Sequence, residues 1–276
     1  MGEFTEWTIA DAARHIAVPS EQDDKYSRGV LGVITGSVEY PGAAVIGVEA
    51  ALRTGVGMVR YLGESTVGQL VLQRRPEAVC VAGRVQAWLI GSGIDADDTS
   101  ETTDAAIIAA MHQPVPIVLD GASVRHYAES AGPVVITPHV RELAILISGD
   151  PAAIAADPAR AARETADRLG VTVVLKGHST WVAAPNVLFR VRQAPTWLAT
   201  AGAGDALGGI LGALAATHAA EAMTKTTQLA ELAATAVLVH GLAATRASAG
   251  GPFTILDLCR AIPATVADLL SNERSL

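Results

Sequence analysis

Short runs of apolar residues alternate with longer helical patterns along most of this chain of 276 residues. Strands are expected at 30–35, 58–62, 87–90, 117–119, 134–136 and 171–175, and a hairpin at 181–184 and 187–191. Helices are expected at 41–54, 102–112, 160–169, 205–218, 228–248 and 254–270. This alternation predicts one α/β domain over 1–276, with a mostly parallel sheet and helices on both of its faces.

Composition and charge argue against several classes of protein. Half of the residues are hydrophobic, which fits a densely packed globular domain and not a disordered chain. The 20 basic and 28 acidic residues leave a net charge of −8, which argues against a nucleic-acid partner. Cys80 and Cys259 have no metal-ligand spacing, so we expect two buried thiols in a reducing compartment.

The apolar windows of the chain have the composition of core helices. Residues 206–223 and 228–247 contain Glu, His or Gln among many Ala and Gly residues, which is unusual for a membrane span. Residues 1–7 contain two Glu residues and lack the apolar core of a signal peptide. We therefore expect a cytoplasmic protein with no membrane partner.

A loop of small residues at 200–204 leads into Asp205 and then into the apolar run 206–216. A helix that begins here would present free backbone N–H groups and the positive end of its dipole, which suit an anion such as phosphate. Gly202 and Gly204 would let the backbone approach that anion closely. Bound phosphate would repel Asp205, unless this carboxylate takes a proton from a substrate hydroxyl during phosphoryl transfer. The alternative is a glycine-rich turn with Asp205 as an ordinary helix N-cap.

Glycine-rich or polar segments follow five of the expected strands. These segments are 36–37, 91–93, 120, 137–139 and 176–180. In open α/β sheets, ligands bind at the carboxyl ends of the strands. Five such strand ends, together with the loop at 200–204, predict one ligand site at this edge of the sheet.

Several segments carry a family resemblance in chain order. They are 25–30 (Lys-Tyr-Ser-Arg-Gly-Val), 36–37 (Gly-Ser), 41–44 (Pro-Gly-Ala-Ala), 50–57 (Ala-Ala-Leu-Arg-Thr-Gly-Val-Gly), 90–93 (Ile-Gly-Ser-Gly), 137–142 (Thr-Pro-His-x-x-Glu), 176–180 (Lys-Gly-x-x-Thr) and 202–205 (Gly-Ala-Gly-Asp). Together they resemble the NAD(P)H-hydrate dehydratases, a family of the ribokinase-like fold, over about residues 25–248. The resemblance implies a single-domain, three-layer ribokinase-like sandwich.

The resemblance also implies a repair reaction on damaged nicotinamide cofactors. Family members use ADP or ATP to phosphorylate the hydroxyl of NADH or NADPH hydrate. Phosphate is a better leaving group than hydroxide, so its elimination then restores the reduced cofactor. The partners implied for this chain are therefore the hydrate and an adenine nucleotide, with Mg²⁺ as a cofactor.

By position, the resemblance assigns residues to three parts of a site. Ala43, Gly93, His139 and Asp205 match the hydrate-binding positions, and Asp205 also matches the catalytic carboxylate. The adenine-nucleotide positions are matched by Lys176, Gly177, His178, Ser179, Thr180 and Gly204. The anion hole corresponds to Gly202, Ala203 and Gly204. Glu142 would help to hold Mg²⁺ through water.

Most of these residues have a structural alternative. His139 could begin a helix without a ligand, Lys176 could be a solvated lysine at a strand end, and Glu142 could only cap its helix. Asp120 could end its strand as a turn residue. The other histidines lack metal-ligand spacing and are expected to be structural or exposed: His15, His112, His126, His178, His218 and His240.

Two loops depart from the family pattern. Residues 194–199 stand where the family usually has Asn-Pro-Gly-Met, and 120–126 where it tends to have Asp-Ala-Asp-x-Leu-Asn. The choices between ADP and ATP and between the two hydrates therefore stay open. Two rival functions are a ribokinase-like kinase for a vitamin precursor or sugar, and a nucleotide-binding regulator without turnover. We expect a homo-oligomer, with a tetramer as one form to test.

Overall fold

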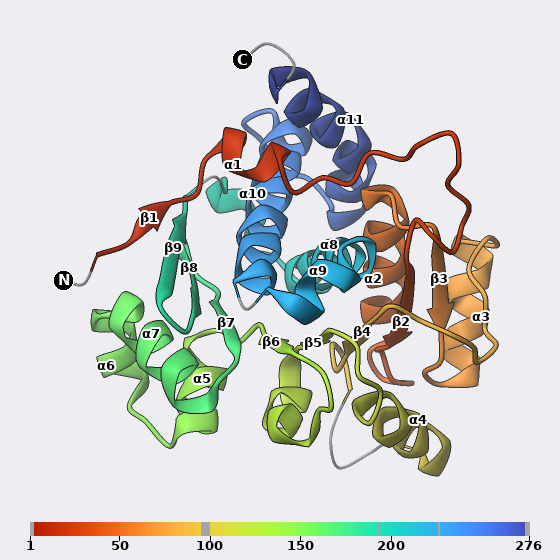
Figure 1. Cartoon of the computed structure of the whole chain (residues 1–276), viewed down its shortest axis with the longest axis horizontal. Coiled ribbons are helices and arrows are strands. Elements are labelled where there is room, and N and C mark those ends of the chain that lie inside the picture. The colour runs from red at the N-terminus through yellow and green to blue at the C-terminus, as the bar shows by residue number, and fades with distance from the viewer. Residues whose placement is uncertain (1–2, 95–99, 193, 226, 274–276) are drawn as a thin grey trace.

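The computed structural model describes residues 3–94, 100–192, 194–225 and 227–273. Within these residues nine strands form one sheet, in the order β1-β9-β8-β7-β6-β5-β4-β2-β3 (Figure 1). The strands are β1 (Thr5–Glu6), β2 (Val30–Ile34), β3 (Met58–Tyr61), β4 (Ala87–Ile90), β5 (Ile117–Leu119), β6 (Val134–Ile136), β7 (Thr172–Leu175), β8 (Thr180–Ala184) and β9 (Val187–Val191).

Six neighbouring strands, from β7 across to β3, run parallel to one another. The hairpin partner β8 is antiparallel to both β7 and β9, and β1 pairs with β9 at the edge. Every residue of β2, β4, β5, β6 and β7 is buried. Strands covered on both faces need continuous apolar runs, which explains why these strands could be predicted from the sequence. The predicted α/β sheet and hairpin are confirmed.

Helices cover both faces of the sheet (Figure 1). The first layer contains α1 (Ile9–Ala13), α2 (Pro41–Thr54), α3 (Ser65–Arg74), α8 (Ala203–Thr217), α9 (Ala219–Thr224), α10 (Gln228–Ser248) and α11 (Ile255–Glu273). The opposite layer contains α4 (Glu101–Met111), α5 (Val140–Ile147), α6 (Pro151–Ala156) and α7 (Pro158–Leu169). Two 3₁₀ segments, η1 (Gly121–Glu129) and η2 (Thr196–Leu198), follow β5 and precede α8. Each helix layer packs on the sheet through its own hydrophobic core. Alternate residues of a strand belong to the two cores, with Leu31 in the first and Val30 in the second.

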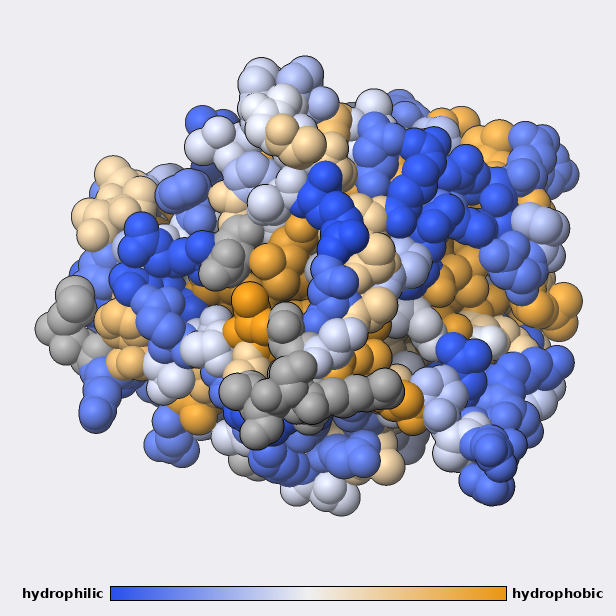
Figure 2. Space-filling view, turned by 90° about the horizontal axis from the view of Figure 1, so that it is seen from above, coloured by the Kyte–Doolittle hydropathy of each residue, from blue (hydrophilic) through white to orange (hydrophobic). Residues whose placement is uncertain are grey.

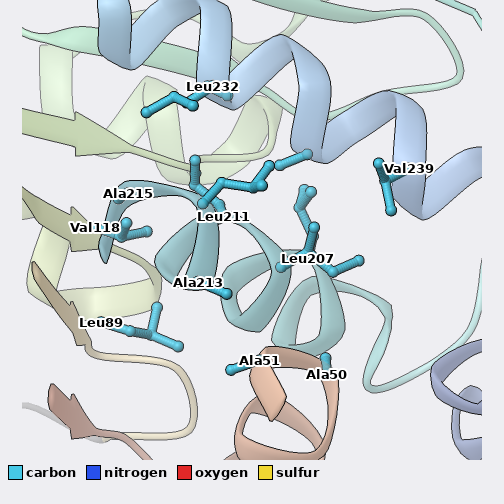
Figure 3. Close-up of a cluster of buried hydrophobic side chains, with 14 of the residues drawn as sticks. Ala50, Ala51, Leu89, Val118, Leu207, Leu211, Ala213, Ala215, Leu232 and Val239 are labelled. Carbon is cyan, nitrogen blue, oxygen red and sulfur yellow. The ribbon is translucent and has the colours of Figure 1, made fainter. Parts of the chain in front are cut away.

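Helix α8 is buried between the sheet and other helices of its layer. Leu89 and Val118 approach it from β4 and β5, Ala50 and Ala51 from α2, and Leu232 and Val239 from α10 (Figure 3). At Gly209 a Cβ atom would lie 2.2 Å from the Gly47 carbonyl oxygen, so the α2 and α8 backbones are in direct contact. This packing fixes the start of α8 relative to the carboxyl ends of the strands.

The two apolar windows form core helices, as the sequence predicts. α10 is long and apolar enough to cross a membrane, but 78% of its most apolar window is buried inside the protein. Eleven residues of α8, from Ala206 to Ala216, are buried. Cys259 is buried as expected, whereas Cys80 is exposed, so that expectation is wrong for Cys80.

The face that carries α1, α10 and α11 exposes hydrophobic side chains between groups of hydrophilic ones (Figure 2). A cavity of about 420 Å³ lies on these helices. It is lined by Ile9, Leu242, Thr245, Arg246, Thr265, Asp268 and Leu269. Polar side chains therefore interrupt the apolar surface here.

The Ala-Leu-Arg-Thr-Gly block, which follows Ala50, ends helix α2. Gly55 is its C-cap in the left-handed region, with φ of 109°, a conformation that favours glycine. Arg53 Nε donates to Glu49 Oε1 at 2.6 Å, and Thr54 Oγ1 donates to the Ala50 carbonyl at 2.8 Å. This part of the family motif therefore has a structural role.

Glu49 itself is a buried carboxylate surrounded by arginines. Its side chain is 0% exposed and pairs with Arg53, Arg74 and Arg75. Burial alone would raise the pKa of Glu49, but the hydrogen bonds from these guanidinium groups lower it to about 2. The network ties α2 to α3 and the residue that follows it.

We expect Glu49→Gln to lower the free energy of unfolding at pH 7, because the arginines lose their buried carboxylate partner. The loss should be only about 1–2 kcal/mol, because the guanidinium groups stay partly hydrated. A carboxylate whose pKa is lowered in the folded state stabilises the protein at pH values above its ordinary pKa. This contribution is lost as the pH falls toward the folded-state pKa. The pKa of Glu49 falls from 4.5 to about 2, so the difference between wild type and variant should shrink across that interval. Urea unfolding at several pH values measures it.

The matched control is Glu77→Gln. Glu77 is 51% exposed and pairs only with Arg75 among the described residues, at 3.4 Å. Its replacement should change stability by less than about 0.5 kcal/mol at every pH. Equal effects of the two substitutions would contradict a special role for Glu49.

Candidate active site

Asp120 lies at the centre of the carboxyl edge of the sheet, directly after β5, and is 6% exposed. Its Oδ2 accepts a hydrogen bond from Ser92 Oγ at 2.9 Å. Its Oδ1 accepts from Thr137 Oγ1 at 2.6 Å and from Lys176 Nζ at 2.9 Å. These donors follow β4, β6 and β7, so the predicted convergence of strand ends is confirmed. The interpretation of Asp120 as a simple turn residue is wrong, because its side chain is the buried centre of this cluster.

The charges of Asp120 and Lys176 stabilise each other. Burial alone would raise the pKa of Asp120, but the Lys176 charge and the hydrogen bonds lower it. Burial alone would lower the pKa of Lys176, but the carboxylates of Asp120 and Glu142 raise it. Glu142 Oε2 lies 3.7 Å from Lys176 Nζ. Both members of the pair are therefore ionised at neutral pH.

The start of α8 has the geometry of an anion site. Gly202 is its N-cap, with φ of 88° and no side-chain cap. Within the described residues, the N–H groups of Gly204 and Asp205 have no backbone partner. A Cβ atom on Gly204 would lie 3.6 Å from Lys176 Nζ, so the ammonium group lies beside these free N–H groups. A free helix start with a lysine beside it is suited to phosphate.

Asp205 is the third residue of α8 and not its N-cap. None of the described residues donates a hydrogen bond to its carboxylate. Burial and the nearby charge of Asp120 raise the pKa of Asp205 to about 6, while Lys176 opposes this shift. A carboxylate with such a pKa is mostly ionised at pH 7 and is a better proton acceptor than an ordinary Asp.

His139 and Glu142 cap the start of α5. His139 Nδ1 accepts from the N–H groups of Arg141 and Glu142, at 3.1 and 3.2 Å, and Glu142 Oε2 accepts from the His139 N–H at 2.7 Å. This pattern makes Nδ1 an acceptor, so Nε2 carries the proton and can donate to a ligand. Glu142 therefore caps α5, and its metal role stays a prediction.

A cavity of about 970 Å³ adjoins this cluster. Of the predicted site residues, His139, Lys176, Gly177, His178, Thr180, Ala203 and Gly204 line it. Apolar residues from the loop before α8, from α8 itself and from α10 line the rest, including Pro195, Leu198, Leu207 and Val237. Its lining does not include Ser179, Gly202, Asp205, Glu142, Ala43 or Gly93. A cavity of this size, lined by both polar and apolar residues, suits a nucleotide with its phosphates at Lys176.

Ala43 and Gly93 form a pair that is separate from the lining of this cavity. A Cβ atom on Gly93 would lie 2.6 Å from the Ala43 Cβ, and Ala43 is only 7% exposed. Ala43 lies one turn before Gly47 on α2, and a Cβ atom on Gly47 would lie 3.6 Å from the Asp205 carbonyl oxygen. The predicted hydrate residues on α2 and after β4 thus lie on the α2 side of Asp205, whereas His139 lines the nucleotide-sized cavity.

His240 is a site residue that the sequence reasoning missed. It is 6% exposed, lines the cavity from α10, and its Nε2 has no hydrogen-bond partner among the described residues. Burial lowers the pKa of His240 to about 4, with hydrogen bonding toward the Ala203 backbone opposing the shift. The ring is therefore neutral at pH 7 and presents a buried polar atom at the cavity.

Comparisons with known proteins show the family of this chain. A model of the NAD(P)H-hydrate dehydratase family matches residues 31–263. The chain belongs to this family. It is 35% identical over 215 residues to an ADP-dependent (S)-NAD(P)H-hydrate dehydratase of Neisseria meningitidis, covering 71% of this chain and 72% of that protein.

A second relative and one solved structure show how much of the chain is covered. A bifunctional NAD(P)H-hydrate repair enzyme of Mycobacterium tuberculosis is 41% identical over 219 residues, covering 75% of this chain and 45% of that enzyme. The chain thus spans about half the length of the bifunctional enzyme. The crystal structure of an ADP/ATP-dependent NAD(P)H-hydrate dehydratase from Bacillus subtilis superimposes with a TM-score of 0.84 at 22% identity, covering 96% of this chain and 99% of that one. This similarity confirms the ribokinase-like fold.

Proposed function

We propose that this chain repairs NADH or NADPH hydrate, using ADP or ATP as the phosphoryl donor. The observation that carries the proposal is the meeting of three groups at one point: the free N–H groups at the start of α8, the Lys176 ammonium, and the unpaired Asp205 carboxylate. The names of the relatives, three of which are described as ADP-dependent (S)-NAD(P)H-hydrate dehydratases, support the same activity. The two parts of the site, the cavity and the Ala43–Gly93 pair, suit the two substrates.

Each step has a residue suited to it. Asp205 takes the proton of the hydrate hydroxyl. At the same time the hydroxyl oxygen bonds to phosphorus, and the bond from phosphorus to the leaving nucleotide breaks. Lys176 and the N–H groups of Gly204 and Asp205 stabilise the charge on the transferring group. The carbon–oxygen bond of the phosphate ester then breaks, phosphate leaves with the electron pair, and loss of a ring proton restores the nicotinamide.

Magnesium fits this site only together with the nucleotide. The described residues contain no group of three or more His, Cys, Asp or Glu side chains placed to hold a metal ion. Mg²⁺ commonly keeps several waters and binds through one or two carboxylates plus substrate phosphates. We propose that Glu142 contributes through water, where the ion would neutralise phosphate charge.

We also propose that the protein is one domain over 1–276 and works in the cytoplasm as a homo-oligomer, without a nucleic-acid or membrane partner. The function itself is tested with purified protein, NADH hydrate, Mg²⁺ and ADP or ATP. The near-ultraviolet absorbance of NADH should recover only when nucleotide is present. Accumulation of a stable phosphate ester would instead indicate a small-molecule kinase, and nucleotide binding without any turnover would indicate a regulator.

A further inference from the structure

Three acidic residues act on Lys176 near the start of α8, namely Asp120, Glu142 and Asp205. Its ammonium group lies beside Gly204, the residue that precedes Asp205. Among the described residues, however, its ion pairs are with Asp120 at 2.9 Å and Glu142 at 3.7 Å, and none joins it to Asp205. The base and the cation of the proposed reaction are therefore close but unpaired.

Hydrogen bonds hold the Asp120 side chain in the position where it pairs with Lys176. Three hydrogen bonds from different strand ends fix both of its carboxylate oxygens, and its side chain is 9% exposed. Buried charges need such partners, so the arrangement is specified by the fold and not by a mobile surface contact. An ammonium group at a helix start is also repelled by the helix dipole, which a fixed carboxylate offsets.

We propose that Asp120 is a positioning residue, which holds the Lys176 ammonium at the phosphate-binding loop and away from the Asp205 carboxylate. Without Asp120, Lys176 would pair with Asp205, and this pair would make Asp205 a weaker base. The effect of Asp120 on catalysis rests on the proposed function. Its effect on Lys176 and Asp205 concerns the protein without nucleotide and does not depend on turnover. Asp120 and Lys176 are the charged groups that act on Asp205, from the ends of β5 and β7.

The test is a carboxyl NMR titration of Asp205 in nucleotide-free protein, combined with steady-state kinetics. In the wild type Asp205 should titrate near pH 6. In Asp120→Asn, which preserves the shape of the side chain and removes its charge, the midpoint should fall by a unit or more. The kcat should drop about tenfold or more while the KM for nucleotide changes less than threefold. A merely structural role would raise the KM for nucleotide and leave kcat unchanged.

The matched control is Thr137→Val, which removes a neutral hydrogen bond from the same Asp120 oxygen and leaves both charges in place. Its Asp205 midpoint should stay near the wild-type value. An unchanged midpoint in Asp120→Asn overturns the proposal. If that variant does not fold, the wild type decides: a midpoint near the ordinary Asp value of 3.8 overturns the proposal. Because the titration needs no turnover, failure of the proposed function remains distinguishable from failure of this inference.

Discussion

Asp205→Asn should lower kcat for NADH-hydrate repair by about 10²–10⁴-fold. The substitution keeps the shape of the side chain and removes its basicity. Asn also relieves the repulsion between a carboxylate and bound phosphate, so nucleotide affinity should stay within about threefold of the wild type or rise slightly. Stability should hold as well, because the N-cap of α8 is Gly202 and Asp205 caps nothing.

The pH dependence of the wild type provides a second reading of the same residue. Protonated Asp205 cannot accept a proton, so kcat/KM should fall as pH drops through about 6. A matched control is Glu101→Gln, since Glu101 is an exposed acidic residue in the first turn of α4. That variant should retain full activity and the same pH profile. Turnover of Asp205→Asn within threefold of the wild type would contradict the assignment of Asp205 as the base.

Lys176→Met should weaken ADP or ATP binding by about 10–150-fold, or ~1.5–3 kcal/mol. Two effects act in the same direction. The variant loses a charge-assisted contact to phosphate, and it leaves the buried Asp120 carboxylate without the cation that now offsets it. Titration calorimetry with ADP measures the affinity, and a thermal melt shows whether the variant is folded.

Lys225→Met is the matched control for Lys176→Met. Lys225 is also a lysine in an ion pair, with Glu231, but its side chain is 54% exposed and lies outside the cavity lining. Its loss removes the same unit of charge from the protein. Nucleotide affinity should therefore change less than about twofold. Wild-type ADP affinity in Lys176→Met would remove Lys176 from the site.

The strands that carry the site could be predicted from the sequence because they are buried on both faces. Three of them, β4, β5 and β6, have the predicted bounds, as do β9, α2 and α10. Most of the elements that were missed are short: β1 has two residues, α1 has five, and α6 and α9 have six, while the missed helices α5 and α3 have eight and ten. The short segments contain too little periodicity to distinguish a helix from a loop, and their stability comes from tertiary packing.

The candidate site could be predicted only in part. The loop at 202–205 has a local signature, because glycine, a carboxylate and an apolar helix follow one another directly. Asp120 and Lys176 are 56 residues apart, and their pairing depends on the order of the strands in the sheet. His240 lies in the middle of an apolar helix, and only packing determines that it faces the cavity.

The most direct test of the account measures all products of one reaction. Purified protein is incubated with NADH hydrate, Mg²⁺ and ADP, and the NADH, AMP and inorganic phosphate that form are quantified together. We predict that the three appear in equal amounts with the wild type and that all three form about 10²–10⁴-fold more slowly with Asp205→Asn. NADH formation without nucleotide consumption, or a phosphorylated hydrate that accumulates without NADH, would contradict the account.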